Sequence, residues 1–489
     1  MSTEQTAEAS PGDAPGAVRA PGSPARRRWA RPRPPWADGL WLATGLILLV
    51  AGLFTVSLMP PGQGNDEPNH FLRVNGLLNG VLVPDPHGEP SAPTKFDACT
   101  LSYLHEVEQR AIAPGPMRLG NFDDYPSGCQ GQTGARDYDN TAVYSPVPYA
   151  GHLVGAGLMR LVGAGPVAAL YAARILGFLL YVALVLAALR VAPTGRLFIA
   201  VVALLPMSVI QASVVSTDGA AYGLALLAAA LVLRLREREE PDRRAALGLG
   251  VVLAALALTK VPHIAFVALV LLVPWRHFAP ERRRADLLRA ATAGVPVLLL
   301  LGWNALAGRI TVSNLPTVDP DRQLSWIFEH PSGFLEVLRV SMFTDVTRDV
   351  FFQLPGAFSF FRTTPVVPQL PGFWVVCAYL ALGFALAAGR RPVLVSGRGP
   401  RLQAAWALLA GLGGVALVYL ALYLVWTDVG APSVSGIQPR YFVPFLAFIL
   451  VAVATAFKRG GADPPWPPFA AVSAAMLAVI VYQITLVYY

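Results

Sequence analysis

A short polar stretch, GNDEPNH, follows directly on the first long apolar run of the chain. It places Asp66, Glu67 and His70 within one helical turn, on one face of a helix that would begin at Pro68. Side chains of these types can act as general acids and bases. They can equally cap a helix that lies on a membrane surface, because Asp and Glu are common at helix N-termini. A zinc-protease motif is excluded, since it would require a histidine at position 66.

Two cations stand at the ends of other apolar runs. Lys260 lies in ALTKVPH, and Arg440 lies in the turn GIQPRYFVP between Gln438 and Tyr441. Cations beside a carboxylate at the lipid–water boundary suit transfer from a lipid-linked phosphate, because the cations bind the phosphate while the carboxylate accepts the proton of the acceptor. Each cation also has a simpler explanation. Lys260 could extend its ammonium group to the headgroups, and Arg440 could bind carbonyls at a helix end.

Two further charged residues accompany the apolar runs. Arg174 lies within the run 166–189, where a buried arginine requires an acidic partner. Asp218 follows Ser216 and Thr217 at the start of another run, and we expect it to be a simple helix cap.

The composition of the chain indicates a membrane protein. Of its 489 residues, 54% are hydrophobic and only 14% are charged, and the mean hydropathy is +0.51. Soluble domains contain roughly 25% charged residues. The net charge of +8 does not indicate nucleic-acid binding, because the basic residues form short clusters between apolar runs, as in the loops of membrane proteins. No nucleic-acid partner is therefore expected.

The apolar runs of the chain predict an all-α, polytopic bundle of about 11 transmembrane helices. The apolar runs lie near 40–59, 166–189, 197–212, 218–233, 246–259, 262–275, 290–308, 371–389, 403–426, 441–457 and 467–487. The weaker candidate 144–163 would reverse the sidedness of all later loops if it crossed. The positive-inside rule therefore favours an interfacial or re-entrant helix there and a cytoplasmic N-terminus.

This topology divides the chain into three parts. Residues 1–38 form a disordered basic tail in the cytoplasm, residues 39–457 form the membrane module, and residues 458–489 form a last loop and helix. The module has two large extracytoplasmic loops, at about 60–165 and 309–370. In the second loop we expect Trp326, Phe328 and Leu335 to pack on the bundle. The short inside loops lack Walker and Rossmann patterns, so the chemistry is expected at the outer leaflet.

Cysteine use agrees with this sidedness. Cys99 and Cys129 both lie in the first outside loop, where an oxidising compartment favours a disulfide between them. The alternative is two free or metal-linked thiols, although no CxxC or Cys/His spacing supports a metal.

The order of these motifs resembles the GT-C superfamily of lipid-dependent glycosyltransferases. More closely, the chain from about residue 40 to 457 is similar to a bacterial family of predicted membrane proteins with a domain of unknown function, grouped with that superfamily. The matching stretches are NDEPNHFLRV, YSPVPYAGHL, ALTKVPHIA, QLSWIFEHP and GIQPRYFVP.

The resemblance implies roles for individual residues. Asp66, with Glu67 as its neighbour, would be the general base or would orient the acceptor. Lys260 and Arg440 would bind the donor phosphate. The other substrate-binding candidates are His70, which matches the family pattern without a known role, and Gln438 and Tyr441, which flank Arg440. Pro439 stands where the family usually has glycine, which stiffens this turn.

The implied partners are a polyprenyl-phosphate-linked sugar, membrane lipids and a glycan or other acceptor of the cell envelope. Some members of the superfamily use a divalent cation and others none, and one Asp–Glu pair does not decide between them. Three other functions stay open: a flippase or transporter of lipid-linked glycans, a polymerase or ligase that joins whole glycans, and a partner protein without catalysis. No internal repeat of the transporter kind is present, and the ionisable residues gather at the outer boundary, which favours the transferase.

Overall fold

The computed structural model of the protein describes most of the membrane module. Described are residues 38–83, 96–112, 132–134, 136, 138–308, 317–343, 379, 383, 393–394, 397–458 and 466–488. The tail predicted over 1–38 lies outside these ranges except for Asp38, as do Cys129 and Cys377. The compact unit discussed below begins at Gly39.

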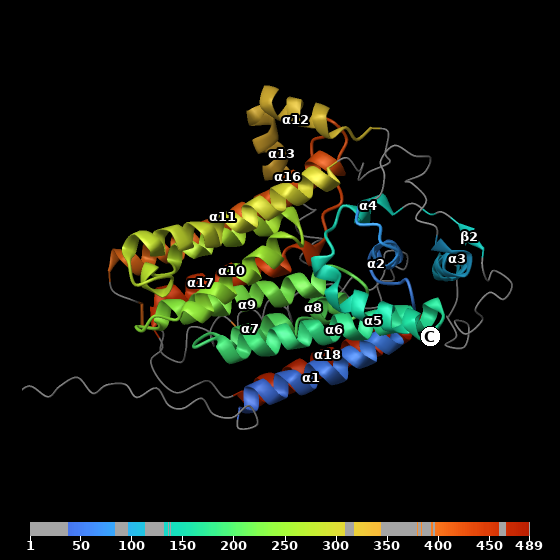
Figure 1. Cartoon of the computed structure of the whole chain (residues 1–489), viewed down its shortest axis with the longest axis horizontal. Coiled ribbons are helices and arrows are strands. Elements are labelled where there is room, and N and C mark those ends of the chain that lie inside the picture. The colour runs from blue at the N-terminus through green and yellow to red at the C-terminus, as the bar shows by residue number, and fades with distance from the viewer. Residues whose placement is uncertain are drawn as a thin grey trace, which may run out of the picture. The chain divides into compact units, whose positions relative to one another are not determined.

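The described chain is almost entirely helical, which confirms the predicted fold class (Figure 1). Its α-helices are α1 (Gly39–Leu58), α2 (Glu67–Leu78), α3 (Ala98–Ile112), α4 (Asp139–Ala142), α5 (Ala150–Leu161), α6 (Pro166–Val191), α7 (Arg196–Ala203), α8 (Pro206–Ala212), α9 (Asp218–Glu237), α10 (Arg243–Ala257), α11 (Arg282–Ala307), α12 (Pro320–Glu329), α13 (Pro331–Phe343), α16 (Arg398–Val425), α17 (Leu446–Ala456) and α18 (Trp466–Tyr488). The 3₁₀ helices are η3 (Val147–Tyr149), η4 (Val261–Leu272), η5 (Trp275–His277), η6 (Pro439–Tyr441) and η7 (Val443–Phe445). Two antiparallel pairs of two-residue strands complete it: β1 (Phe96–Asp97) with β2 (Thr133–Gly134), and β3 (Val393–Leu394) with β4 (Phe457–Lys458).

Six segments of the described chain are long and apolar enough to cross a bilayer. They are Gly39–Leu58, Pro166–Val191, Asp218–Glu237, Arg282–Ala307, Arg398–Val425 and Pro439–Ala456. Each coincides with one of the predicted runs. Their lengths of 18 to 28 residues match the ~20 residues that span ~30 Å of hydrocarbon. The protein is therefore a polytopic membrane protein.

The remaining predicted runs form shorter elements or lie outside the described residues. Pro206 ends the first half of the run 197–212, which becomes the separate helices α7 and α8. The run 246–259 forms the 15-residue α10, and the run 262–275 forms the 3₁₀ helix η4. Most of the run 371–389 is not described.

The segment 144–163 forms a short helix that packs closely on α6. With 12 residues, α5 rises only about 18 Å and is too short to span a bilayer. Gly151 and Gly155 stand four residues apart and face the backbone of α6. A Cβ at Gly155 would lie 2.1 Å from the carbonyl oxygen of Ala172. Small residues at this spacing allow two helices to approach at backbone distance.

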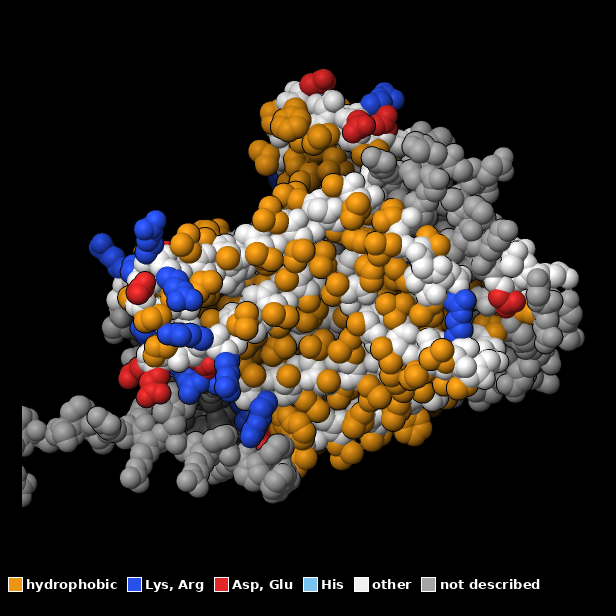
Figure 2. All heavy atoms as spheres, in the orientation of Figure 1, with side chains coloured by type: hydrophobic (Ala, Val, Ile, Leu, Met, Phe, Trp, Pro, Cys, Tyr) orange, Lys and Arg blue, Asp and Glu red, His pale blue; other side chains and the backbone are white. Residues whose placement is uncertain are grey.

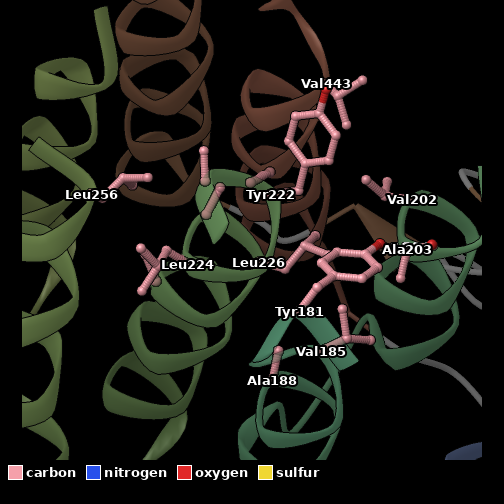
Figure 3. Packing of buried hydrophobic residues seen from close by; sticks show 14 of the residues in the cluster. Tyr181, Val185, Ala188, Val202, Ala203, Tyr222, Leu224, Leu226, Leu256 and Val443 are labelled. Atoms are coloured by element: carbon pink, nitrogen blue, oxygen red, sulfur yellow. Dashed lines mark hydrogen bonds between the residues drawn. The ribbon is translucent and has the colours of Figure 1, made fainter. Parts of the chain in front are cut away.

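Helix α9 lies at the centre of the bundle, and 89% of its most apolar window is buried. It packs against α6, α10 and α17. Figure 3 shows how tyrosines fill this core: Tyr181 of α6 points toward Val202 and Ala203 of α7, and Tyr222 of α9 lies beside Val443. The Tyr181 hydroxyl donates to the carbonyl of Ala203 at 2.7 Å, so its polar end is satisfied inside the apolar core.

The surface of the bundle separates charged from uncharged regions (Figure 2). A broad apolar flank without charged side chains covers the helices, and Lys and Arg side chains gather at the end where α9 turns into α10 and α11 begins. Such a flank is the surface expected of helices that face lipid.

Candidate active site

Four charged side chains from four separate elements meet at the end of α9 that lies opposite the basic cluster. Asp66 directly precedes α2, Asp218 is the first residue of α9, Lys260 directly precedes η4, and Arg440 lies in η6. They are far apart in sequence, and only the packing of α2, α9, η4 and η6 brings them together.

The four side chains alternate in charge along a continuous chain of contacts. Arg440 forms an ion pair with Asp66, and its Nη1 lies 3.5 Å from Oδ2 of Asp218. The other carboxylate oxygen of Asp218 accepts a hydrogen bond from Nζ of Lys260 at 2.5 Å. The order is therefore Asp66, Arg440, Asp218, Lys260, and the charges of the cluster balance. Buried charges require such pairing.

Exposure rises from the buried middle of this cluster toward both of its ends, and most strongly toward Asp66. The side chains of Arg440 and Asp218 are each 3% exposed, Lys260 is 14% exposed and Asp66 is 33% exposed. Asp66 is thus the carboxylate of the cluster that a substrate can reach. Lys260 is the more accessible of the two cations.

The backbone at Asp66 has an unusual conformation. Its φ of 59° is left-handed, which no other non-glycine residue of the described chain adopts. Asp tolerates this region better than most residues, yet it is sparsely populated and recurs at functional sites. The carbonyl of neighbouring Asn65 accepts a hydrogen bond from Nη1 of Arg440 at 3.2 Å, so Arg440 binds both the backbone and the side chain of this turn.

Aromatic rings surround Lys260, at one end of the cluster. Nζ of Lys260 lies 4.9 Å from the ring centre of Tyr441 and 5.8 Å from that of Tyr144. The imidazole of His70 stacks on Tyr144, and its Nδ1 lies 2.6 Å from the hydroxyl of Tyr149. Cations beside ring faces are stabilised by the ring quadrupole. Gln438 is half-buried and caps η6, where its carbonyl accepts from the amide of Tyr441.

The pKa values of two site residues follow from burial and charge. Burial raises the pKa of Asp66, but Arg440, His70 and Lys260 together outweigh burial and hold that pKa below its ordinary value. Burial lowers the pKa of His70 to about 3, although Asp66 acts in the opposite direction. At neutral pH Asp66 is a carboxylate and His70 is neutral.

Glu67, expected beside Asp66 as a second catalytic carboxylate, points away from the site. It forms a bidentate pair with Arg174, with Nε–Oε1 2.7 Å and Nη2–Oε2 2.6 Å, and both side chains are fully buried. Its carboxylate also accepts hydrogen bonds from the amides of Gly62, Gly64 and Val215. Both carboxylate oxygens of Glu67 are thus occupied inside the protein, so the structure does not bring Glu67 to the side chains that surround Asp66. Glu67 is the acidic partner that a buried Arg174 requires.

The ion pair of Glu67 and Arg174 holds in place the two chain segments that carry Asp66 and Asp218. Arg174 donates to the carbonyls of Val56, Met59 and Pro60 at the end of α1. Glu67 follows Asp66 directly, and it holds the amide of Val215, three residues before Asp218. One buried ion pair thus fixes both segments that carry the acidic residues.

The expectation that Asp218 is a simple cap is wrong. Thr217 occupies the N-cap position of α9, and Asp218 binds Lys260 and Arg440 instead of backbone amides. Tyr144 and Tyr149 were also missed as site residues. A charged residue at the start of an almost wholly buried helix was the available signal for Asp218, because such residues need a partner.

The described residues do not fit a divalent cation. No group of three or more His, Cys, Asp or Glu side chains within the described ranges could hold one. The carboxylates of Asp66 and Asp218 are instead neutralised by Arg440 and Lys260. No reaction step is therefore derived through a metal. Cys99 forms a disulfide, and its pairing with Cys129 stays a prediction.

Comparison with known proteins identifies a family. The model of the family described as predicted membrane protein (DUF2142) matches residues 48–449. No curated protein matches the chain. One solved structure that resembles it is ArnT from Cupriavidus metallidurans bound to undecaprenyl phosphate, with a TM-score of 0.40 and 17% identity. The alignment covers 86% of this chain and 60% of that one, so the chain spans less than two thirds of its length.

Proposed function

The chain belongs to the DUF2142 family of predicted membrane proteins, and we propose that it is a membrane glycosyltransferase. It transfers a sugar from a polyprenyl-phosphate donor in the outer leaflet to an acceptor of the cell envelope. The proposal concerns the substrates and the reaction, which the family description leaves open.

One observation carries the proposal: an accessible carboxylate lies next to two largely buried cations. Lys260 carries three N–H donors, and Asp218 accepts one of them. A phosphate oxygen can therefore bind its ammonium group while the ion pair persists. Arg440 adds a fixed positive charge between the two carboxylates. This combination supports binding of a phosphate by the two cations and of an acceptor hydroxyl by Asp66.

The aromatic rings beside Lys260 support a sugar as the group that is transferred. Tyr144 and Tyr441 flank Lys260, and sugar rings pack their C–H faces on aromatic side chains while carboxylates accept their hydroxyl hydrogens. Basic side chains gather at the opposite end of the bundle (Figure 2), and the positive-inside rule, which favours a cytoplasmic position for such an end, supports a site at the outer leaflet.

The reaction is a single displacement. The acceptor hydroxyl donates a hydrogen bond to Asp66, and its oxygen attacks the anomeric carbon of the donor. The bond between that carbon and the phosphate oxygen breaks, and the electron pair leaves with the lipid phosphate, whose charge Lys260 and Arg440 stabilise. Asp66 takes the proton as the new bond forms, since a carboxylate of low pKa is a weak base in the ground state. The configuration of the anomeric carbon is inverted.

The experiment compares lipid-linked sugars and envelope glycans of a deletion strain with those of complemented strains. Without the protein, the polyprenyl-phosphate sugar should accumulate, and the acceptor should lack one sugar. Wild-type protein should restore both. The variant Asp66→Asn should restore neither, whereas Asp321→Asn, which changes an exposed carboxylate of α12, should act as wild type.

Purified protein separates transfer from transport. In vesicles that contain the donor, a transferase releases polyprenyl phosphate only when an acceptor is present. A flippase would move the intact donor across the bilayer without cleaving it, and Asp66→Asn would leave that movement unchanged. Such a result would overturn the proposal. The mass added to the acceptor, one sugar or a whole glycan, separates a transferase from a ligase.

A further inference from the structure

The hairpin of α12 and α13 carries large apolar side chains that remain exposed. Phe328 is 77% exposed, Leu335 is 66% exposed and Phe343 is 78% exposed. The expectation that Phe328 and Leu335 pack on the bundle is therefore wrong. The same expectation is confirmed for Trp326, whose ring centre lies 5.9 Å from the ring centre of Tyr423 in an edge-on arrangement.

The inward faces of the two helices anchor the hairpin to the bundle. Oε1 of Gln323 accepts a hydrogen bond from the amide of Gly430 at 2.9 Å, and Oγ of Ser341 accepts one from Val434 at 2.9 Å. Both contacts are made to the segment 427–436, which leads into η6. The exposed apolar side chains take no part in this anchoring, so they form a separate surface.

The outward surface of the hairpin carries charged as well as apolar side chains, and on α13 Leu335, Arg339 and Phe343 recur every four residues and share one face. Asp321, Arg322, Glu336 and Arg339 are exposed. In Figure 2 the charged side chains lie at the tip and toward the side away from the basic end of the bundle, whereas apolar side chains cover the side above the uncharged flank. Elements at a membrane surface combine exposed apolar side chains with charged ones, and an arginine among them can extend its guanidinium to the headgroups.

We propose that the hairpin α12–α13 lies on the bilayer, with Phe328, Leu335 and Phe343 inserted among lipid acyl chains. We infer lipid because the hairpin follows a membrane span in the chain and, like the last turns of that span, exposes large apolar side chains. The hairpin comes soon after α11, a candidate membrane span, whose last turns expose Leu301 (59%) and Leu306 (57%). The hairpin also holds the segment that leads to Arg440, so lipid contact and the position of Arg440 are mechanically linked.

The test places a fluorescent label on each side of the hairpin. Full-length variants Phe328→Cys and Leu335→Cys are labelled with bimane in nanodiscs of phosphatidylethanolamine and phosphatidylglycerol. The matched control is Arg322→Cys, at an exposed charged position of α12 that faces a different direction from Phe328. Labelled wild-type protein supplies the background from the native cysteines. Each sample is measured with lipids that carry a nitroxide on the acyl chain, and separately with iodide in the water.

Insertion predicts that the nitroxide lipids quench the labels at 328 and 335 while iodide does not, together with a blue shift of their emission. The label at 322 should show the reverse pattern. Equal quenching by iodide at all three positions would overturn the proposal, because the apolar side would then face water. Protection from both quenchers would also overturn it, since protein rather than lipid would cover this surface.

Discussion

The carboxylate of Asp66 pairs with the guanidinium of Arg440, a residue 374 positions later in the chain. This contact joins the turn before α2 to the 3₁₀ helix η6, and through Asp218 it reaches Lys260. The carbonyl of Arg440 in turn accepts a hydrogen bond from Tyr222 of the central helix at 2.9 Å. The site therefore depends on contacts between elements that are remote in sequence.

The first prediction concerns Asp66 as the acceptor-binding carboxylate. Asp66→Asn keeps the shape of the side chain but removes its charge, and a positioned base contributes on the order of 10²- to 10⁴-fold to the rate. We expect the rate of sugar transfer in vesicles to fall by that order, and thermal stability to fall less than in Glu67→Gln, because Arg440 keeps Asp218 as a partner. Asp321→Asn is the control. Full transfer by Asp66→Asn would exclude this role.

The second prediction concerns Lys260 as a ligand of the donor phosphate. Hydrogen bonds to charged groups contribute about 1.5–3 kcal/mol, so Lys260→Gln should raise the KM for the donor on the order of 10- to 100-fold. Lys260→Arg should recover part of the loss, and Arg322→Gln, at an exposed cation of α12, should change nothing. An unaltered KM in Lys260→Gln would mean that Lys260 only neutralises Asp218.

The third prediction concerns the buried pair of Glu67 and Arg174. Glu67→Gln leaves an uncompensated buried guanidinium, and breaking a buried pair costs about 3–5 kcal/mol. We expect a large drop in the midpoint of thermal unfolding in detergent. The exposed pair of Glu336 and Arg339 supplies the matched control, since Glu336→Gln should leave the midpoint unchanged. A Glu67→Gln protein of normal stability without transfer activity would restore Glu67 as a catalytic residue.

The fourth prediction concerns the pH dependence of stability. Unfolded His70 takes up a proton near its ordinary pKa of ~6.5, whereas folded His70 takes one up only near its pKa of about 3. The unfolded state binds more protons between these values, so the free energy of unfolding falls as the pH falls through this window. His70→Gln should therefore lose less stability between neutral and acidic pH than wild type. His330→Gln, at an exposed histidine, should behave as wild type, and an unchanged slope in His70→Gln would contradict the assignment.

The fifth prediction concerns the disulfide of Cys99. If Cys129 is its partner, the variants Cys99→Ser and Cys129→Ser should lose similar stability, on the order of 2–5 kcal/mol. The double variant should be no less stable than either one. Peptide mapping without reduction should recover one peptide pair that contains both residues. A free thiol at Cys129 in the wild-type protein would assign another partner.

Much of the architecture can be predicted from the sequence because hydropathy acts locally. Apolar runs that must satisfy their own backbone in lipid become helices, so the all-α class and the six long spans follow from composition and length. Charged residues at the ends of such runs are costly, and for this reason Asp66, Lys260 and Arg440 were identifiable as candidates. Pro206 divides the run 197–212 into two helices, whereas the run 262–275 becomes the 3₁₀ helix η4, which its apolar pattern does not indicate.

Only the tertiary structure decided which charge pairs with which. Asp66 and Glu67 are adjacent and chemically alike, yet the left-handed backbone at Asp66 directs one carboxylate toward Arg440 and the other toward Arg174. Asp218 looked like a cap because its sequence neighbours are good caps, whereas Lys260 and Arg440 reach it from distant elements. Ion pairs form across space, and their partners here lie 42 to 374 residues apart. The local sequence pattern thus indicates which charged residues need a partner, and the packing of the helices determines which residue that partner is.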